Sequence, residues 1–118
     1  MSLDREGYDP TDEKHDEIVS KITRDRRDQE IRDLKSVLST NAGRRFIWRQ
    51  LSIAGLFQNP FTGNNTTFFN CGKQEIAQRL LADVMEAEPS AFSKMQVEEK
   101  ERQDAEDQKF LKESKDVR

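Results

Sequence analysis

The sequence contains only one cysteine and one histidine, and each shortage narrows what the chain can do. The single cysteine, Cys71, excludes an intramolecular disulfide and fits a reducing compartment. The single histidine, His15, lies among acidic residues and cannot build a multi-histidine zinc site or a histidine-based catalytic triad. The carboxylates lie in charged, solvent-type runs, whereas paired-carboxylate catalysis needs a desolvated site. We therefore expect no enzymatic activity, no metal and no cofactor.

Apolar residues are also scarce. They make up 33% of the 118 residues, and charged residues make up 36%. This composition is poor for a globular domain, so we expect a single small core with solvated helical arms. No run approaches the roughly 18 apolar residues of a membrane span, and the first ten residues lack the apolar region of a signal peptide. We therefore expect neither a membrane span nor secretion.

The aromatic content that is present lies in the middle of the chain. Residues 39–85 hold six of the nine aromatic residues and four of the five glycines, with five basic and two acidic groups. Residues 1–38 carry 8 basic and 11 acidic groups, and residues 86–118 carry 7 and 10. A basic, aromatic centre of net charge +3 thus lies between two arms of −3 each. The centre should hold the core and any binding surface, and the overall balance argues against a dedicated nucleic-acid binder.

The periodicity predicts an all-α fold. Residues 1–11 are polar, contain a glycine and a proline, and are predicted to be a disordered or extended arm. Residues 12–38 have loosely helical apolar spacing, which predicts a long helix with only its last two turns firmly packed. Residues 88–118 are highly charged, so this arm is either an exposed helix or disordered. Residues 39–87 are left to form the packed core.

Within that core we predict two helices, residues 41–54 and 66–87, joined by a structured aromatic loop over residues 55–65. Three local signals support these bounds. Ser39 or Thr40 can cap the first helix, Gly55 suits the position after its end, and Asn65 or Thr66 can cap the second helix. The second helix has the strongest apolar periodicity in the chain.

The apolar pattern also predicts which side chains are buried. One face of the second helix should pack through Phe69, Ile76, Leu80 and Val84, and the first helix through a stripe of Phe46, Ile47, Leu51 and Ala54. Gly72 inside a helix costs about 1 kcal/mol relative to alanine, which a close helix–helix approach would explain. Cys71 has no histidine beside it and is interpreted as a small buried residue.

The sharpest polar cluster is formed by Arg44, Arg45, Trp48 and Arg49. On a helix Arg45 and Arg49 are neighbours, with Trp48 next to them. Guanidinium groups beside an indole can bind phosphate or carboxylate groups and stack on the ring. This predicts a docking surface for an acidic protein or for a DNA backbone. Alternatively, the arginines pair with the chain's own acidic arms and Trp48 is half-buried core.

The loop segment NPFTGNN, residues 59–65, is a weaker candidate for binding. Its asparagine, threonine and glycine residues could cradle an anion, but it lacks the lysine and the spacing of a phosphate-binding loop. We favour the interpretation that the turn seats Phe61 in the core. The remaining candidate partner-binding residues are Phe61, Asn64, Lys73 and Arg79.

Six short motifs between residues 33 and 87 together resemble a family of small tailed-bacteriophage proteins first noted in phages of Bordetella. No single motif is specific, but their combination is. The motifs are Gly43-Arg44-Arg45, Trp48-Arg49, Ala54-Gly55, Phe61-Thr62-Gly63-Asn64, Phe68-Phe69 and Leu80-Leu81-Ala82.

The resemblance implies a virion structural protein, made in the bacterial host cytoplasm, with no enzymatic activity to transfer. We expect it to dock in many copies on a symmetric assembly of phage structural proteins at the portal, neck or internal core. The acidic arms would reach along neighbouring proteins, because an apolar-poor chain can gain order on a partner. The alternative is a protein that contacts the backbone of packaged DNA through Arg44, Arg45 and Arg49.

Overall fold

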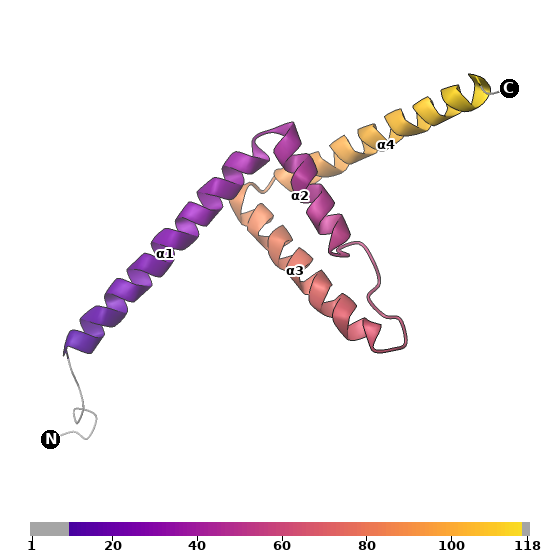
Figure 1. Ribbon diagram of the computed structural model, residues 1–118. Helices are drawn as coiled ribbons and strands as arrows, with labels where there is room; N and C mark the ends of the chain where they lie inside the picture. Colours follow the sequence, from indigo (N-terminus) through magenta and orange to yellow (C-terminus); the bar gives the residue numbers. More distant parts are fainter. Residues whose placement is uncertain (1–9, 117–118) are drawn as a thin grey trace.

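A computed structural model describes residues 10–116, which form four α-helices (Figure 1). Helix α1 spans Pro10–Leu38, α2 spans Asn41–Ile53, α3 spans Thr66–Ala87 and α4 spans Ala91–Asp116. The described part of the chain contains no strand. The predicted all-α fold is confirmed, and the charged C-terminal arm is a helix.

The helices diverge from one junction and do not form a compact bundle. Helices α1 and α4 leave the junction in opposite directions, while α2 and α3 form a hairpin that projects between them (Figure 1). The radius of gyration is 23.0 Å and the extents are 92 × 40 × 17 Å, whereas a compact chain of this length would have a radius of about 13–14 Å. The distal parts of both outer helices are therefore exposed along their whole length.

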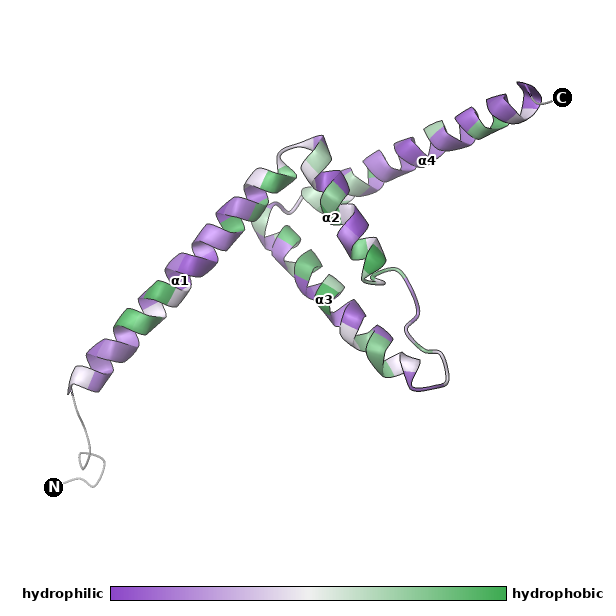
Figure 2. Cartoon of the chain, viewed as in Figure 1, coloured by the Kyte–Doolittle hydropathy of each residue, from purple (hydrophilic) through white to green (hydrophobic). Residues whose placement is uncertain are grey.

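A small hydrophobic core lies where the four helices meet. Every helix contributes to it, and Trp48, Leu80 and other half-buried side chains pack around it. Figure 2 shows that the outer helices are mainly hydrophilic away from this junction. The core of this elongated chain is thus confined to a few helical turns. Its buried apolar residues are Leu38, Ile47, Leu51, Ala77, Val84, Ala87, Ala91 and Met95.

The turn between α1 and α2 depends on Thr40 and Gly43. The Thr40 hydroxyl accepts a hydrogen bond of 3.0 Å from the Gly43 N–H, which confirms the predicted cap. A Cβ on Gly43 would lie 1.8 Å from the carbonyl oxygen of Val37. Since no side chain fits there, α2 can begin this close to α1 only because residue 43 is glycine.

The loop after α2 is held against α3 by amide side chains. Gly55 has a φ of 79°, as predicted for the residue that ends this helix. The side-chain amide of Gln74 donates to the carbonyls of Gly55, at 3.0 Å, and Gln58, at 2.7 Å. The amide of Asn70 donates to the Pro60 carbonyl at 3.2 Å. These bonds give the loop a defined path although it has little buried apolar surface.

Helix α1 starts slightly earlier than the sequence predicted. Pro10 and Thr11 already belong to the helix, so the predicted arm over residues 1–11 is wrong at its end, and its first nine residues lie outside the described part. The apolar packing of α1 is confined to Ile31, Leu34 and Leu38 in its last two turns, as predicted. About one turn earlier, Arg27 adds a polar contact with α3.

Arg27 fixes this contact by binding two carboxylates of α3. Its guanidinium donates to Asp83 at 2.6 Å and to Glu86 at 2.7 Å. The hydrogen bond to Asp83, followed by the one to Glu86, raises the pKa of Arg27 above its ordinary value. Arginine is protonated at neutral pH in any case, so both contacts are charged pairs.

A buried ion pair joins three helices at the junction. Arg44 on α2 donates through Nε to Glu98 on α4 at 2.7 Å, and through Nη1 to the Leu38 carbonyl at 2.9 Å. The two charged side chains are only 9% and 12% exposed. Among the described residues Arg44 is the one charged residue that is buried. This contact fixes α2 and α4 against the end of α1.

Several residues predicted to be buried lie on the surface of the hairpin. Phe61, Phe69 and Ile76 are exposed, so the loop does not seat Phe61 in the core and the first half of α3 has no covering helix. Cys71 is exposed. No other part of the described chain comes within 4 Å of a Cβ placed on Gly72. These predictions are wrong because the hairpin extends beyond the junction, from which α1 and α4 lead away.

Replacing Gly43 with alanine should destabilise the fold. The added Cβ overlaps the Val37 carbonyl, so the turn must open, and we expect the free energy of unfolding to fall by about 2 kcal/mol or more. The matched control is Gly72→Ala, which enters open space and should stabilise the helix by up to about 1 kcal/mol. Urea denaturation in dilute solution, followed by circular dichroism, measures both. Similar changes in the two variants would contradict this account.

Removing the buried arginine should be more damaging. Arg44→Met keeps most of the side-chain volume but leaves Glu98 buried without its cation, so we expect a loss of about 3–5 kcal/mol in urea denaturation. Arg44→Met combined with Glu98→Met should recover most of this loss, because no buried charge remains. Arg79→Met, which breaks an exposed pair with Glu75, should cost less than about 1 kcal/mol. A double variant no more stable than Arg44→Met would contradict the electrostatic explanation.

Candidate functional site

The arginine–aromatic segment of α2 divides between two sides of the helix. Successive helical residues are turned by about 100°, so neighbouring arginines point in different directions. Arg44 faces the junction, where its guanidinium is bound by Glu98 and Leu38. Arg45 and Arg49 face solvent. Pairing with an acidic arm, the alternative left open by the sequence, is therefore found for Arg44, whose guanidinium is engaged inside the fold.

Arg45, Phe46 and Arg49 form an exposed surface that we name the α2 basic face. The guanidinium carbon of Arg49 lies 5.3 Å from the centroid of the Phe46 ring, a cation–π contact, and Phe46 is half exposed. With Ala42 these residues line an open hollow of about 370 Å³. Neither Arg45 nor Arg49 forms a salt bridge with any described residue. Both can therefore bind carboxylate or phosphate groups of another molecule.

Trp48 packs against other aromatic rings of the chain. Its ring lies 5.0 Å from that of Phe57 in the loop and 6.0 Å from that of Phe92 on α4, measured between centroids. Phe57 and Phe92 lie 6.4 Å apart. The Trp48–Phe57 pair is tilted by 33° and the other two pairs are stacked, so the three rings connect α2, the loop and α4. The half-buried state of Trp48 agrees with the alternative interpretation.

Asn64 organises the start of α3. Its Oδ1 accepts hydrogen bonds from the Thr66 N–H at 2.9 Å and from the Thr62 hydroxyl at 2.8 Å. Asn65, predicted as a possible cap, makes no side-chain cap bond. The Thr62 N–H donates to the Thr67 hydroxyl at 2.9 Å. The loop motif therefore stabilises the N-terminal end of α3, and Phe61 projects from it into solvent.

Lys73 and Arg79 lie on α3, apart from the α2 basic face. Lys73 Nζ is 5.9 Å from the centroid of the Phe69 ring. Arg79 is exposed and pairs with Glu75, one helical turn earlier, at 3.0 Å. The eight candidate residues thus do not form one site. Arg45 and Arg49 lie together, Arg44 and Trp48 support the fold, and the other four line the loop and α3.

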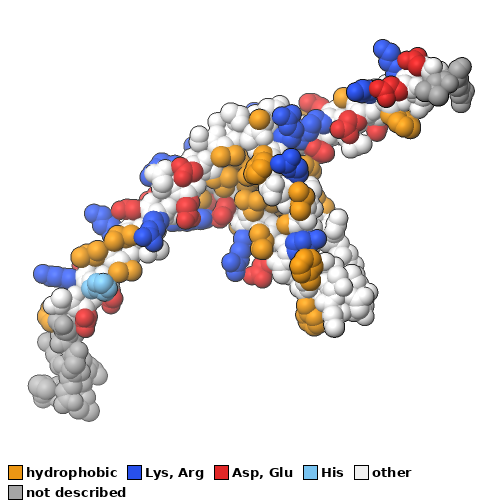
Figure 3. All heavy atoms as spheres, in the orientation of Figure 1, with side chains coloured by type: hydrophobic (Ala, Val, Ile, Leu, Met, Phe, Trp, Pro, Cys, Tyr) orange, Lys and Arg blue, Asp and Glu red, His pale blue; other side chains and the backbone are white. Residues whose placement is uncertain are grey.

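The structure adds surface residues that the sequence did not single out for binding. They are apolar side chains of the hairpin that face solvent, and Figure 3 shows hydrophobic side chains along it next to basic ones. The sequence shows their helical spacing, but apolar residues at this spacing are typical of a buried core face as well as of a binding surface. Only the directions of α1 and α4 show that nothing in the described chain covers them. The residues are Phe46, Ile53, Phe68, Phe69 and Ile76.

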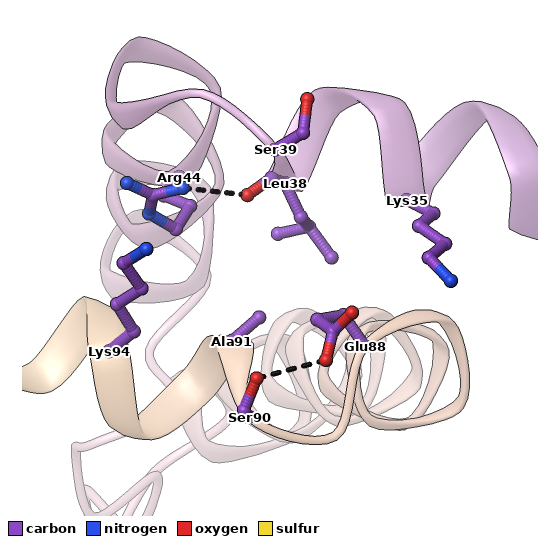
Figure 4. A pocket seen from close by; sticks show the side chains of 8 residues that line it. All are labelled: Lys35, Leu38, Ser39, Arg44, Glu88, Ser90, Ala91 and Lys94. Carbon is purple, nitrogen blue, oxygen red and sulfur yellow. Dashed lines mark hydrogen bonds between the residues drawn. The ribbon is translucent and has the colours of Figure 1, made fainter.

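A second hollow, of about 300 Å³, lies at the helix junction (Figure 4). Lys35 and Lys94 border it from α1 and α4. Glu88 accepts a hydrogen bond of 2.9 Å from the Ser90 hydroxyl, and Arg44 is bound to the Leu38 carbonyl, as Figure 4 shows. The charged groups without a hydrogen bond shown here are the exposed Lys35 and Lys94, so we interpret this hollow as a surface gap between the ends of the helices and not as a binding site.

Two further features are absent from residues 10–116. No group of three or more histidine, cysteine, aspartate or glutamate side chains is placed to hold a metal ion. None of the helices in this range is both long and apolar enough to cross a bilayer.

Comparison with known proteins identifies one family. No curated protein and no solved structure matches the chain. A family model described as Bbp19-like phage protein matches residues 34–96, which is 63 of the 118 residues. The matched range contains every buried residue of the core, the whole hairpin and the first turns of α4, and it leaves out most of both arms. It also covers nearly all of the stretch in which the sequence resembles small phage proteins. The chain therefore belongs to the family of Bbp19-like phage proteins.

Proposed function

We propose that this phage protein is a structural component of the virion that docks in many copies on a portal, neck or internal-core protein. The docking surface is the α2 basic face, and the role requires no catalysis by the chain. This proposal combines the family, the elongated shape and the exposed chemistry of α2. Synthesis in the host cytoplasm followed by incorporation into the particle is part of the same proposal.

The observation that carries the proposal is the state of Arg45 and Arg49. Neither guanidinium group has a carboxylate partner among residues 10–116, and that of Arg49 lies over the exposed ring of Phe46. Arginine and aromatic side chains are enriched in protein interfaces, where the ring supplies buried area and the guanidinium binds carboxylates in a fixed geometry. An acidic, partly apolar surface on a larger protein matches this combination.

The outer helices suit an extended contact with neighbouring proteins. Beyond the junction, α1 and α4 carry charges of both signs (Figure 3). They also carry small groups of exposed apolar side chains, such as Ile18 with Ile22 on α1 and Phe110 with Leu111 on α4. Helices of this type have little to pack against within one chain. We propose that they lie along adjacent subunits of the assembly, which would add contact area on either side of the docked hairpin.

Contact with packaged DNA is the second candidate, and the same free guanidinium groups favour it, since they can also bind phosphate oxygens. Two features make a protein partner the better match. The chain carries a net charge of −3, and Glu98 and Glu101 line a hollow together with Arg45. Carboxylates beside the arginine weaken the positive field that a DNA backbone requires.

Neutralising the α2 basic face should reduce incorporation into particles. We expect Arg45→Gln combined with Arg49→Gln to lower the amount of protein in purified particles by at least about tenfold, because the charged contacts with the partner are lost. Glutamine is preferred because glutamate at position 45 would repel Glu98 and Glu101. Quantitative mass spectrometry of particles from a complemented phage deletion measures the effect.

The matched control is Arg24→Gln combined with Arg26→Gln, which removes the same charge from exposed positions on α1. It should be incorporated at a much higher level than the α2 variant, because α1 contributes only to the secondary contact along the neighbouring subunit. Normal incorporation of the α2 variant would contradict the proposal. Binding of the purified wild-type chain to duplex DNA, with a steep fall as salt increases, would favour the DNA alternative instead.

A further inference from the structure

An apolar surface on α3 has no partner within the described chain. Phe68, Gly72 and Ile76 are spaced by four residues and share one side of the helix, with Phe69 beside them. Phe68 is 79% exposed, Phe69 69% and Ile76 66%. We name these four residues the α3 apolar face. Figure 2 shows hydrophobic residues continuing along α3 toward the free end of the hairpin.

Gly72, at the centre of this face, has no function inside the fold. Glycine is the least favourable residue in a helix interior apart from proline. At Gly43 a close backbone contact explains the glycine, but a Cβ on Gly72 would meet nothing within 4 Å beyond its own helical turn. A second helix could cross the face closely at Gly72, where no Cβ is in the way, because helix axes approach more closely where the contact residues are small. The glycine thus points to a helical occupant.

We propose that the occupant is α3 of a second copy of this chain, crossing antiparallel at Gly72 about a two-fold axis. This arrangement places Phe68 of one copy opposite Ile76 of the other, and the reverse, because both residues lie four positions from the glycine. The contact is isologous, so the same surface serves both copies and the assembly closes as a dimer. It uses a different helix from the α2 basic face and does not depend on the proposed docking.

The charges around the face decide between the two orientations. In the antiparallel register Arg79 lies opposite Asn65, Glu75 opposite Phe69 and Lys73 opposite Cys71. No like charges meet. In a parallel register Arg79 would face Arg79, and Glu75 would face Glu75, which is unfavourable. The antiparallel register therefore avoids the like-charge contacts that the parallel register would create.

The available area is enough for a dimer of modest affinity. A phenylalanine side chain offers about 150–250 Å², and about 70% of that remains exposed in Phe68 and Phe69. With Ile76 the face supplies about 330–470 Å² per copy, so about 650–950 Å² in total. Polar residues at its rim, such as Asn65 and Arg79, bring the buried area to about the 1,000 Å² expected of a specific interface.

Sedimentation equilibrium of the purified full-length chain over a concentration series tests the proposal. We expect a reversible monomer–dimer equilibrium in the wild type, and Ile76→Glu should weaken dimerisation by at least about tenfold, because it buries two carboxylates in an apolar contact. The matched control is Phe110→Glu on the distal part of α4, which should leave the dimer unchanged. Its side chain is 69% exposed, close to the 66% of Ile76. A wild type that stays monomeric throughout the series overturns the proposal.

Gly72→Ala gives a second test that does not rely on introducing a charge. At concentrations where the chain is monomeric, alanine should raise the melting temperature, since it enters open space on a helix. In the dimer the two added methyl groups keep the helices apart, so the dissociation constant should rise by at least about threefold. A variant that melts higher and dimerises as well as the wild type contradicts the crossing at Gly72.

Discussion

The Arg44 guanidinium, buried between Glu98 and the carbonyl of Leu38, is the interaction on which the arrangement of the helices depends. It joins the end of α1, the start of α2 and the first turns of α4 in one contact. The apolar core beside it is small, so hydrophobic burial alone leaves the helix directions weakly defined. A buried ion pair adds little net stability, but its geometry permits few alternatives. The pair thus explains how an apolar-poor chain holds one arrangement of four helices.

The local features of this fold could be predicted from the sequence. Thr40 as a cap, Gly55 after the end of α2, and the periodicity of residues 66–87 each act over a few residues, so one sequence contains the whole signal. The partner of Arg44 could not be predicted, because Glu98 lies 54 residues away and is one of 23 acidic residues. Periodicity also identified an apolar face at Phe69 and Ile76 without telling what covers it. Exposure of that face follows from helix directions that are fixed at the junction.

The binding surface could be predicted in its chemistry but only partly in its residues. On a helix Arg45 and Arg49 lie on one side and Arg44 is turned about 100° from Arg45, so the three can have different environments, and the sequence did not show which of them faces inward. Arg44 takes the inward position, where it binds the Leu38 carbonyl. Trp48 also faces inward and packs against the rings of Phe57 and Phe92. What remains outside is a hairpin with two different surfaces, a basic one on α2 and an apolar one on α3. In the account proposed here, the first serves a larger phage protein and the second serves another copy of the chain.

The central claim is that the junction alone orders this chain, and that the distal helices and hairpin surfaces are left for partners. Amide hydrogen exchange of the dilute, free protein, resolved along the sequence, tests it most directly. The account predicts the slowest exchange near Leu51, Val84 and Met95, and exchange at least about a hundredfold faster in the first turns of α1 and the last turns of α4. Uniform protection from one end of the described helices to the other would contradict it.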